Sequence, residues 1–454
     1  MTNHIARWIH LSLVLLTAVG TVFAISSCQL LGSTTDNPPT ATVVTTATVT
    51  PRPYKTPTSQ TTPTVTATAT EDDPSLTLTI WTIESISPDA EGETGSFINN
   101  SLRNFERTHP NIDVDVILKK PSGKGGALDF LRTSKKVAPA ILPDIVILNA
   151  SDLNHAYNEG LVQSLDGKLD RSIVQDLLPA ARKMGTVDDN LVGVPLGLEM
   201  EHTVYNTGTF TAPLVLWSDV LSSNTRYVFP AKGVNGLVND TTLSFYFSSG
   251  GTLLDDQGNP TIDERILRDV LKFYQTAVEN QIIDAGALEA STTEELWPEY
   301  LQADAKLAQI SVSQYITDRV ILQSTSYAPL PVQEEGDTPV LITHGWTMAL
   351  VAEDFEHQKA ALSLIESFMS TDNNALWNTI NRTIPTRDTA YQRVAGDDPY
   401  WAFLADQLNA AQPAPSFDGY DRIGRIIQQA VQQVISGEAT PEEATATAID
   451  ALAQ

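Results

Sequence analysis

The sequence predicts an α/β fold divided into two domains. Short β-rich runs alternate with helical segments along the chain, and this order is typical of α/β crossover units. The run LPDIVILN (142–149) is apolar between Pro and Asn apart from one aspartate, as in strands buried on both faces of a parallel sheet. The composition is globular from Ser75 to Gln454. These roughly 380 residues exceed the roughly 250–300 at which a single core usually divides.

The first elements follow one another as strand, helix and strand. LTLTIWTI (76–83) is a short β-rich run, and FINNSLRNFERTHP (97–110) is an amphipathic helix ended by proline. IDVDVIL (112–118) alternates apolar and polar residues, which is the period of a half-buried strand.

The last elements also carry clear signals. HGWTMALVAE (344–353) predicts a further strand, and HQKAALSLIESFMS predicts the helix that follows it. The closing segment GEATPEEATATAIDALAQ predicts a helix with Thr440 as its N-cap, Pro441 at the first position and Glu443 at the third. This arrangement is a capping box.

The first 27 residues have the pattern of a secretory signal peptide. They carry one firm positive charge, Arg7, and no acidic residue, and the chain from Trp8 to Ile25 is mostly apolar. The stretch Ile25-Ser26-Ser27-Cys28 resembles a bacterial lipobox. That resemblance implies that Cys28 is acylated and that residues 1–27 are removed. The alternatives are an ordinary signal peptide with an incidental cysteine, or an uncleaved anchor.

Cys28 is the single cysteine of the chain, so disulfide scaffolds, cysteine zinc sites and thiol catalysis are excluded. Residues 28–75 follow as a linker. Thr, Pro and Ala dominate it and aromatics are nearly absent, so it cannot bury a core. We interpret it as a semi-stiff stalk between the lipid anchor and the globular part. The alternative is a disordered remnant without a role.

The charge balance limits the partners. Lys and Arg number 28 against 55 Asp and Glu, a formal net charge of −27, which argues against nucleic acid and against polybasic adhesion to lipid. Membrane attachment would therefore depend on the acyl chains. We find no GxSxG, HExxH, phosphate-loop or dinucleotide motif, and we expect no catalysis, cofactor or metal. Glu84 and Glu199 as a glycosidase pair are the enzymatic alternative.

Seven segments occur in an order that resembles a known family. They are TLTIWT, NFERTHPNIDVDV, PDIVILNASDLNHAYNEGLVQSLD, GVPLGLEMEHTVYN, THGWTMALVAEDFEHQKAALSLIESFMS, RTIPTR and ISGEATPEEATATAIDALAQ. Together they resemble the family 1 extracellular solute-binding proteins of ABC importers, the group that includes maltodextrin-binding and other sugar-binding proteins. The resemblance covers nearly all of residues 76–454.

The resemblance implies a two-lobed periplasmic-binding-protein fold of type II, in which each lobe is a sheet flanked by helices and the ligand lies in a cleft between the lobes. Transferred to this chain, lobe 1 holds 76–198 and 328–371, and lobe 2 holds 199–327 and 372–454. The first crossing would be GVPLGLEMEHTVYN, where Pro195 ends a strand of lobe 1. The second would be SYAPLPV (326–332).

In lobe 1, candidate ligand residues follow the strands, because ligands in open α/β sheets lie at the carboxyl ends of strands. Trp81 and Glu84 lie at the end of the first strand, and Trp81 is equally open to a role in the core. Asn149 and Asp152 follow the PDIVIL strand, where they would either bind ligand or cap the next helix.

Four further candidates come from the resemblance. Glu199 occupies the first crossing, where sugar binders of this family place a ligand carboxylate. Tyr315 stands in a turn where the family often has Gly and Trp, which puts sugar stacking there in doubt. Trp346 follows Gly345 as a wall of the cleft or as core, and Arg387 contacts ligand or braces the hinge.

These residues suit a neutral sugar, because aromatic rings stack on sugar faces and carboxylates accept hydrogen bonds from hydroxyls. The resemblance therefore implies a monomeric, lipid-anchored protein on the extracytoplasmic face of a bacterial membrane. It would capture a small solute, such as a sugar or oligosaccharide, and deliver it to ABC permease subunits. The alternatives are a cationic or phosphorylated solute, and a sensor without a transport role.

Overall fold

A computed structural model of the protein describes residues 75–454. The expected signal peptide (1–27), the acylated Cys28 and all but the last residue of the linker (28–75) lie outside this range. Within residues 75–454, no helix is both long enough and apolar enough to span a bilayer.

The first sheet has five strands in the order β2-β1-β3-β12-β6. Strand β1 pairs in parallel with β2 and β3, and β12 runs antiparallel to β3 and β6. The strands are β1 (Leu76–Thr82), β2 (Ile112–Leu118), β3 (Ile145–Asn149), β6 (Val194–Pro195) and β12 (Trp346–Leu350). The predicted strands at 76–83, 112–118 and 142–149 are therefore confirmed, with the third reduced to 145–149.

The second sheet has six strands, in the order β13-β11-β7-β9-β8 with β10 also paired to β7. Its long central strand is β7, which runs antiparallel to β9, β10 and β11. The strands are β7 (Glu199–Asn206), β8 (Tyr227–Val228), β9 (Leu307–Ser311), β10 (Thr325–Ala328), β11 (Ile342–His344) and β13 (Gln412–Pro413). A separate hairpin joins β4 (Thr186–Val187) and β5 (Asn190–Leu191).

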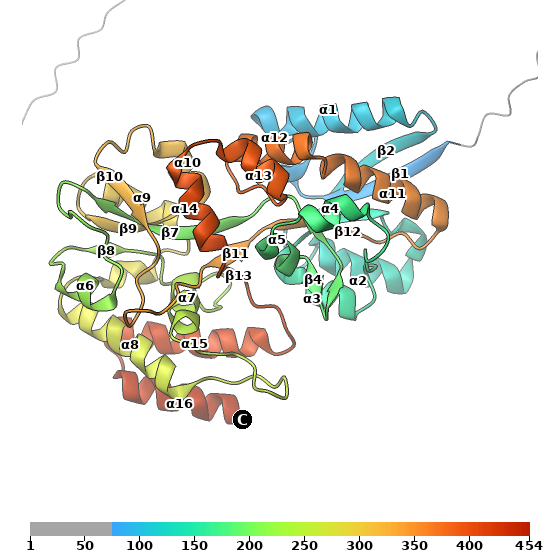
Figure 1. Ribbon diagram of the computed structural model, residues 1–454. Helices are drawn as coiled ribbons and strands as arrows, with labels where there is room; N and C mark the ends of the chain where they lie inside the picture. Colours follow the sequence, from blue (N-terminus) through green and yellow to red (C-terminus); the bar gives the residue numbers. More distant parts are fainter. Residues whose placement is uncertain (1–74) are drawn as a thin grey trace, which may run out of the picture. The chain divides into compact units, whose positions relative to one another are not determined.

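Helices cover both sheets (Figure 1). They are α1 (Gly92–Thr108), α2 (Ala127–Val137), α3 (Leu153–Asn158), α4 (Arg171–Asp176), α5 (Pro179–Met184), α6 (Trp217–Ser222), α7 (Asp240–Ser248), α8 (Glu264–Glu279), α9 (Thr293–Leu301), α10 (Val312–Asp318), α11 (Phe355–Phe368), α12 (Thr371–Asn381), α13 (Asp388–Ala395), α14 (Pro399–Leu408), α15 (Tyr420–Ile435) and α16 (Pro441–Ala453). Short 3-10 turns are η1 (Glu84–Ile86), η2 (Pro139–Ile141), η3 (Ala150–Asp152) and η4 (Ala285–Leu288). The first helix ends before Pro110 as expected, and the predicted capping box of Thr440 and Glu443 is present at α16.

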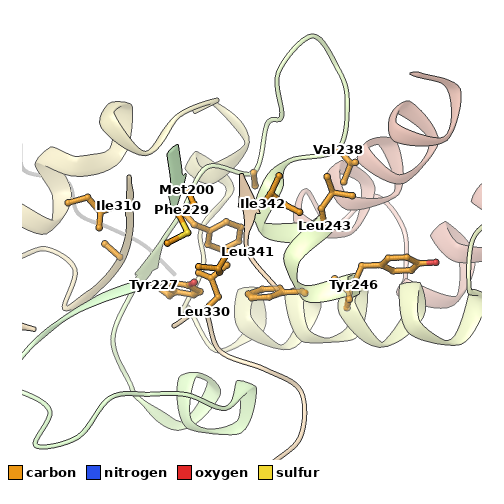
Figure 2. Packing of buried hydrophobic residues seen from close by; sticks show 14 of the residues in the cluster. Met200, Tyr227, Phe229, Val238, Leu243, Tyr246, Ile310, Leu330, Leu341 and Ile342 are labelled. Carbon is orange, nitrogen blue, oxygen red and sulfur yellow. The ribbon is translucent and has the colours of Figure 1, made fainter. Parts of the chain in front are cut away.

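The first sheet separates two cores, because successive side chains of a strand point to opposite faces. Ile145 and Ile147 of β3 pack with α1, α11 and α12, whereas Val146 and Leu148 pack with α2 and α3. The second sheet contributes to one larger core (Figure 2). The alternation explains why β3 is apolar at nearly every position.

The chain passes between the sheets in three adjacent segments. The first leads from Pro195 at the end of β6 to Glu199 at the start of β7. The second is the single residue Gly345, between β11 in the second sheet and β12 in the first. The third segment, residues 383–386, lies between α12 and α13. Its Ile384 pairs with Leu198 of the first segment.

Two expectations about this region are wrong. Residues 344–353 do not form one strand, because Gly345 divides the run between two sheets. The chain also does not cross at 326–332, since β10 and β11 both pair with β7 and the crossing comes at Gly345.

Candidate functional site

Two pairs of strand residues bring predicted site residues together beside Gly345. In the second sheet Glu199 is the register partner of His344, and in the first sheet Asn149 is the register partner of Trp346. The backbone N–H of Ala150 donates to the carbonyl oxygen of Gly345 at 3.0 Å. Polar side chains from both sheets therefore gather where the sheets join.

Position 345 requires glycine for lack of space. A Cβ atom there would lie 2.6 Å from the carbonyl oxygen of Gly197 and 2.9 Å from the Sδ atom of Met184. The close approach allows the first and second crossing segments to run side by side. It also fixes His344 and Trp346 on either side of the junction.

Glu199 begins β7, and its half-buried carboxylate accepts backbone hydrogen bonds. The N–H of Met200 donates to Oε1 at 3.1 Å, and the N–H of Ser313 near the start of α10 lies 3.3 Å from Oε2. Burial raises the pKa of Glu199 to about 7, because the charged form loses more hydration than these hydrogen bonds replace. The carboxyl group thus changes its protonation near neutral pH.

Glu201 lies on the same face of β7 as Glu199, because two residues separate them along the strand. Within residues 75–454 its carboxylate has no hydrogen-bond or ion-pair partner. Burial and then the nearby charge of Asp240 raise the pKa of Glu201 to about 8. This side chain is half-buried, acidic and available to a ligand.

His344 forms the one ion pair of this group. Its Nε2 atom lies 2.7 Å from Oδ2 of Asp240, the first residue of α7. Burial alone would lower the pKa of His344, but the charge of Asp240 and the hydrogen bond to it raise that pKa to about 9. Glu294 lies nearby and accepts a hydrogen bond from Ser311 at 2.8 Å. The charges of Asp240, Glu201 and Glu199 therefore act on one imidazole, and Glu294 lies near Glu201.

These shifts predict a loss of stability with rising pH. The folded protein retains protons on Glu201 to about pH 8 and on His344 to about pH 9, whereas the unfolded chain releases them near the ordinary pKa values of 4.5 for glutamate and 6.5 for histidine. The folded state therefore binds more protons between these limits, so the free energy of unfolding falls as pH rises. We expect a lower melting temperature at pH 9 than at pH 6.5 in a scan of the solute-free protein.

The variant Glu201→Gln tests this assignment, because glutamine has no proton to lose. Its melting temperature should fall less steeply with pH than that of the unmodified protein. Glu279→Gln is the matched control, since Glu279 is exposed at the end of α8 and should leave the pH profile unchanged. Equal slopes in the two variants would contradict the assignment.

Residues 414–420, which lead into α15, contact the residues that follow β3. The Ser416 hydroxyl donates to the carbonyl oxygen of Ser151, and Asp418 lies 4.0 Å from Nδ1 of His155. Burial and the charge of Asp240 raise the pKa of Tyr420, so its hydroxyl remains protonated. Residues 414–420 therefore face the end of β3.

Of the two candidates after β3, Asn149 caps the next turn and Asp152 does not. Asn149 caps η3, since its Oδ1 atom accepts from the N–H of Ser151 at 3.0 Å and from the Ser151 hydroxyl at 2.8 Å. Asp152 makes no such capping bond, and burial raises its pKa. Asp152 therefore remains the freer of the two to meet a ligand.

The end of β1 contributes less than expected. Trp81 is 2% exposed and packs in the core beneath α2, with its ring 6.2 Å from the Phe130 ring and 4.2 Å from the Lys119 amine. Glu84 is exposed in η1. Trp81 is therefore a core residue, and within residues 75–454 no hydrogen bond or ion pair links the Glu84 side chain to the group around Gly345.

Three other candidates take packing roles. Tyr315 lies against His202 and, at 4.4 Å between ring centroids, against Tyr400. Trp346 packs partly buried against the core beneath α11. Arg387 forms an ion pair with Asp176 at 2.7 Å and is 7% exposed. Of the two roles expected for it, the structure gives Arg387 the bracing one.

Sequence reasoning missed Glu201, Asp240, His344 and Tyr420. The spacing Glu199-Met200-Glu201 signals a second carboxylate on the same strand face, and that signal was available. No local pattern relates Asp240 to His344, because they approach each other only through the fold. Within the described range of 75–454, no group of three His, Cys, Asp or Glu side chains has a geometry that could hold a metal ion.

Comparisons with known proteins agree with this architecture. Residues 102–405 match the model of a family described as bacterial extracellular solute-binding protein. Three similar solved structures are the cyclic α-maltosyl-1,6-maltose binding protein of Arthrobacter globiformis, the sugar-binding protein MalE of Xanthomonas citri, and an ABC transporter solute-binding protein of Thermotoga lettingae bound with α-D-tagatose. Their TM-scores are 0.69, 0.67 and 0.65, at 16%, 20% and 20% identity. Each alignment covers 83% of this chain and 97–99% of the other. At this identity the likeness establishes the two-lobed fold.

Proposed function

This chain belongs to the bacterial extracellular solute-binding protein family, and on that basis we propose that it captures a sugar or oligosaccharide where its two sheets meet and delivers it to an ABC permease. The observation that carries the proposal is the group of half-buried polar side chains around Gly345. The carboxyl oxygens of Glu199 and Glu201 can accept hydrogen bonds from the several hydroxyls of a sugar. Similar structures are described as binders of maltose-type sugars or tagatose, which supports this solute class.

The strand pairing refines the proposed lobes. With the second crossing at Gly345, lobe 1 comprises 76–198 and 345–371, and lobe 2 comprises 199–344 and 372–454. The proposed site includes Asp152 from lobe 1, and Glu199 and Glu201 from lobe 2. Trp81, Tyr315 and Arg387 are left out because their side chains are occupied in packing or ion pairing.

The cellular setting belongs to the same proposal. The family is extracytoplasmic, and Cys28 would anchor a monomer to the membrane through its acyl chains, with residues 28–75 as the tether. We propose binding without catalysis, since a carboxylate that accepts hydroxyl hydrogen bonds needs no partner acid. A sensing role without transport would use the same site.

One observation favours a cationic solute as the second candidate. Around Gly345 the carboxyl groups of Glu199, Glu201, Asp240 and Glu294 outnumber the single imidazole of His344. A polyamine would find opposite charge there, although the raised pKa of Glu201 leaves that group neutral at pH 7. The excess charge is thereby reduced, and we favour the sugar.

A thermal-shift panel distinguishes these solutes. We expect maltose, maltotriose or tagatose to raise the melting temperature, because a ligand at about 100 times its dissociation constant adds roughly 2.7 kcal/mol. Spermidine and glucose 6-phosphate represent the cationic and phosphorylated classes. A shift with spermidine alone, or with glucose 6-phosphate alone, would overturn the sugar proposal. Hydrolysis of maltotriose during incubation would overturn the absence of catalysis.

A further inference from the structure

We propose that Asn374 and Asn378 of α12 position the hinge between the lobes. The two buried amides tie the first crossing segment to the third and hold both to the body of lobe 1. This inference rests on the proposed function only in assuming that the lobes move relative to each other around a solute.

Asn378 holds the first crossing segment. Its Nδ2 atom donates to the carbonyl oxygen of Leu196 at 2.9 Å and to that of Asn374 at 2.7 Å, and its Oδ1 atom accepts from the Thr383 hydroxyl at 2.7 Å. The residue is 1% exposed. A Cβ atom on Gly197 would clash with this Oδ1 atom, so the amide packs directly on the glycine backbone. All three bonds form away from water, where an unpaired group is costly.

Asn374 lies one turn earlier on α12 and holds the third segment. Its Nδ2 atom donates to Leu196 O at 3.2 Å and to the Thr386 hydroxyl at 3.0 Å, and its Oδ1 atom accepts from the N–H of Thr386 at 3.1 Å. Both asparagines therefore share the Leu196 carbonyl as an acceptor. That carbonyl precedes Gly197, the residue at which the chain turns towards β7.

Backbone bonds complete the link. Leu198 and Ile384 exchange two hydrogen bonds, each of 2.9 Å, between the first and third segments. Neither segment can therefore bend alone while α12 holds both of them. The second segment, Gly345, has no bond to either asparagine among the described residues.

The helix that carries the asparagines belongs to lobe 1. Trp377 of α12 packs in the core beneath α1, and Asn381 accepts a hydrogen bond from Thr94 of α1 at 3.0 Å. On its other side a recess of about 610 Å³, lined partly by Asn378 and Arg319, separates α12 from α10 of lobe 2. Because α10 does not pack tightly here, α12 meets lobe 2 through the crossing segments and α13. Elsewhere α5 of lobe 1 packs in the core of the second sheet, and Ser416 of lobe 2 bonds Ser151 of lobe 1.

This arrangement gives a physical role to the amides. They hold residues 196 and 383–386 to lobe 1, which limits how far lobe 2 can rotate beside Gly197. Glu199 then meets the lobe 1 residues in a narrow range of orientations. Loss of the link should widen this range and lower the fraction of molecules competent to bind, which weakens apparent affinity.

The test uses the solute-free protein, so it does not depend on knowing the solute. In a Cys28→Ser background, Val137→Cys and Val320→Cys give labelling sites that are 76% and 82% exposed, one in each lobe. Spin labels there report the distribution of distances between the lobes. We expect a wider distribution for Asn378→Ala and for Asn378→Asp, which keeps the side-chain shape but cannot donate to Leu196.

Asn381→Ala is the matched control, because it removes an asparagine of the same helix that bonds Trp377 and Thr94 but no crossing segment. It should lower stability while leaving the distribution unchanged. Amide exchange at Leu198 and Ile384 should accelerate roughly tenfold in the Asn378 variants and stay unchanged in the control. Asn374→Ala provides a second test if an Asn378 variant does not fold.

Unchanged distributions and exchange rates in folded Asn378 and Asn374 variants would overturn the proposal. This result would leave the sugar proposal intact. Conversely, a wider distribution in a protein that binds none of the sugars in the panel would support the hinge role and refute only the solute.

Discussion

Replacing Arg387 by alanine should lower the free energy of unfolding by about 3–5 kcal/mol, the largest stability effect expected in this protein. The guanidinium bonds Asp176 at 2.7 Å and also donates to the carbonyl oxygen of Met369. Both charged side chains are largely buried, at 9% and 15% exposure. The variant leaves Asp176 without its cation and Met369 without a donor. Equilibrium unfolding in urea measures the loss.

Arg393→Ala provides the control for this prediction. Arg393 also pairs with an aspartate, Asp372, but the two side chains are 58% and 78% exposed. Exposed ion pairs contribute about 0–1 kcal/mol, because water already solvates both charges. Similar losses in the two variants would show that burial does not determine the contribution of Arg387, and would contradict its bracing role.

Replacing Glu199 by alanine should weaken solute binding by roughly 10–100-fold, the largest effect expected on affinity. A hydrogen bond between a solute hydroxyl and a charged acceptor is worth about 1.5–3 kcal/mol, and each 1.4 kcal/mol is a factor of ten. The Ser313 N–H would also lose its acceptor. Calorimetric titration with the sugar that gives the greatest thermal shift measures the change.

Two further variants test whether the loss of affinity is specific to the Glu199 carboxylate. Glu279→Ala removes an exposed carboxylate from the same lobe and should leave affinity unchanged. Glu199→Gln imitates the protonated carboxyl, which predominates below about pH 7 because burial raises the pKa of Glu199 to that value. The glutamine variant should therefore bind more like the unmodified protein at pH 6 than at pH 8. Equal affinity of Glu199→Ala and unmodified protein would remove Glu199 from the site.

The sequence predicted the local elements well, because short-range patterns determine them. The alternation in 112–118 and the Thr440 capping box depend on neighbouring residues, and both appear in the structure, the alternation from Ile112 to Ile117. The prediction of a single strand over 344–353 was wrong for a physical reason. Gly345 interrupts neither the apolar pattern nor the extended backbone, so only the pairing of β11 and β12 with different sheets reveals the crossing.

The site was predicted less completely than the fold. The strand ends and the family resemblance point to residues that the structure places beside Gly345, such as Glu199 and Asn149, and their part in binding stays a prediction. Local sequence could not predict that Tyr315 packs against His202 and Tyr400, because these partners approach it only through the fold. The pair of His344 and Asp240 could not be predicted, since 104 positions separate the partners along the chain.

The central claim is that a sugar binds where the two sheets join at Gly345. Hydrogen–deuterium exchange with and without the best sugar of the thermal-shift panel tests this claim most directly. We predict that the sugar slows exchange in 149–158, 199–206, 311–318 and 414–420, which together surround the junction. Protection confined to the recess lined by Arg319, Arg382 and Trp401, or protection in none of these four segments, would contradict it.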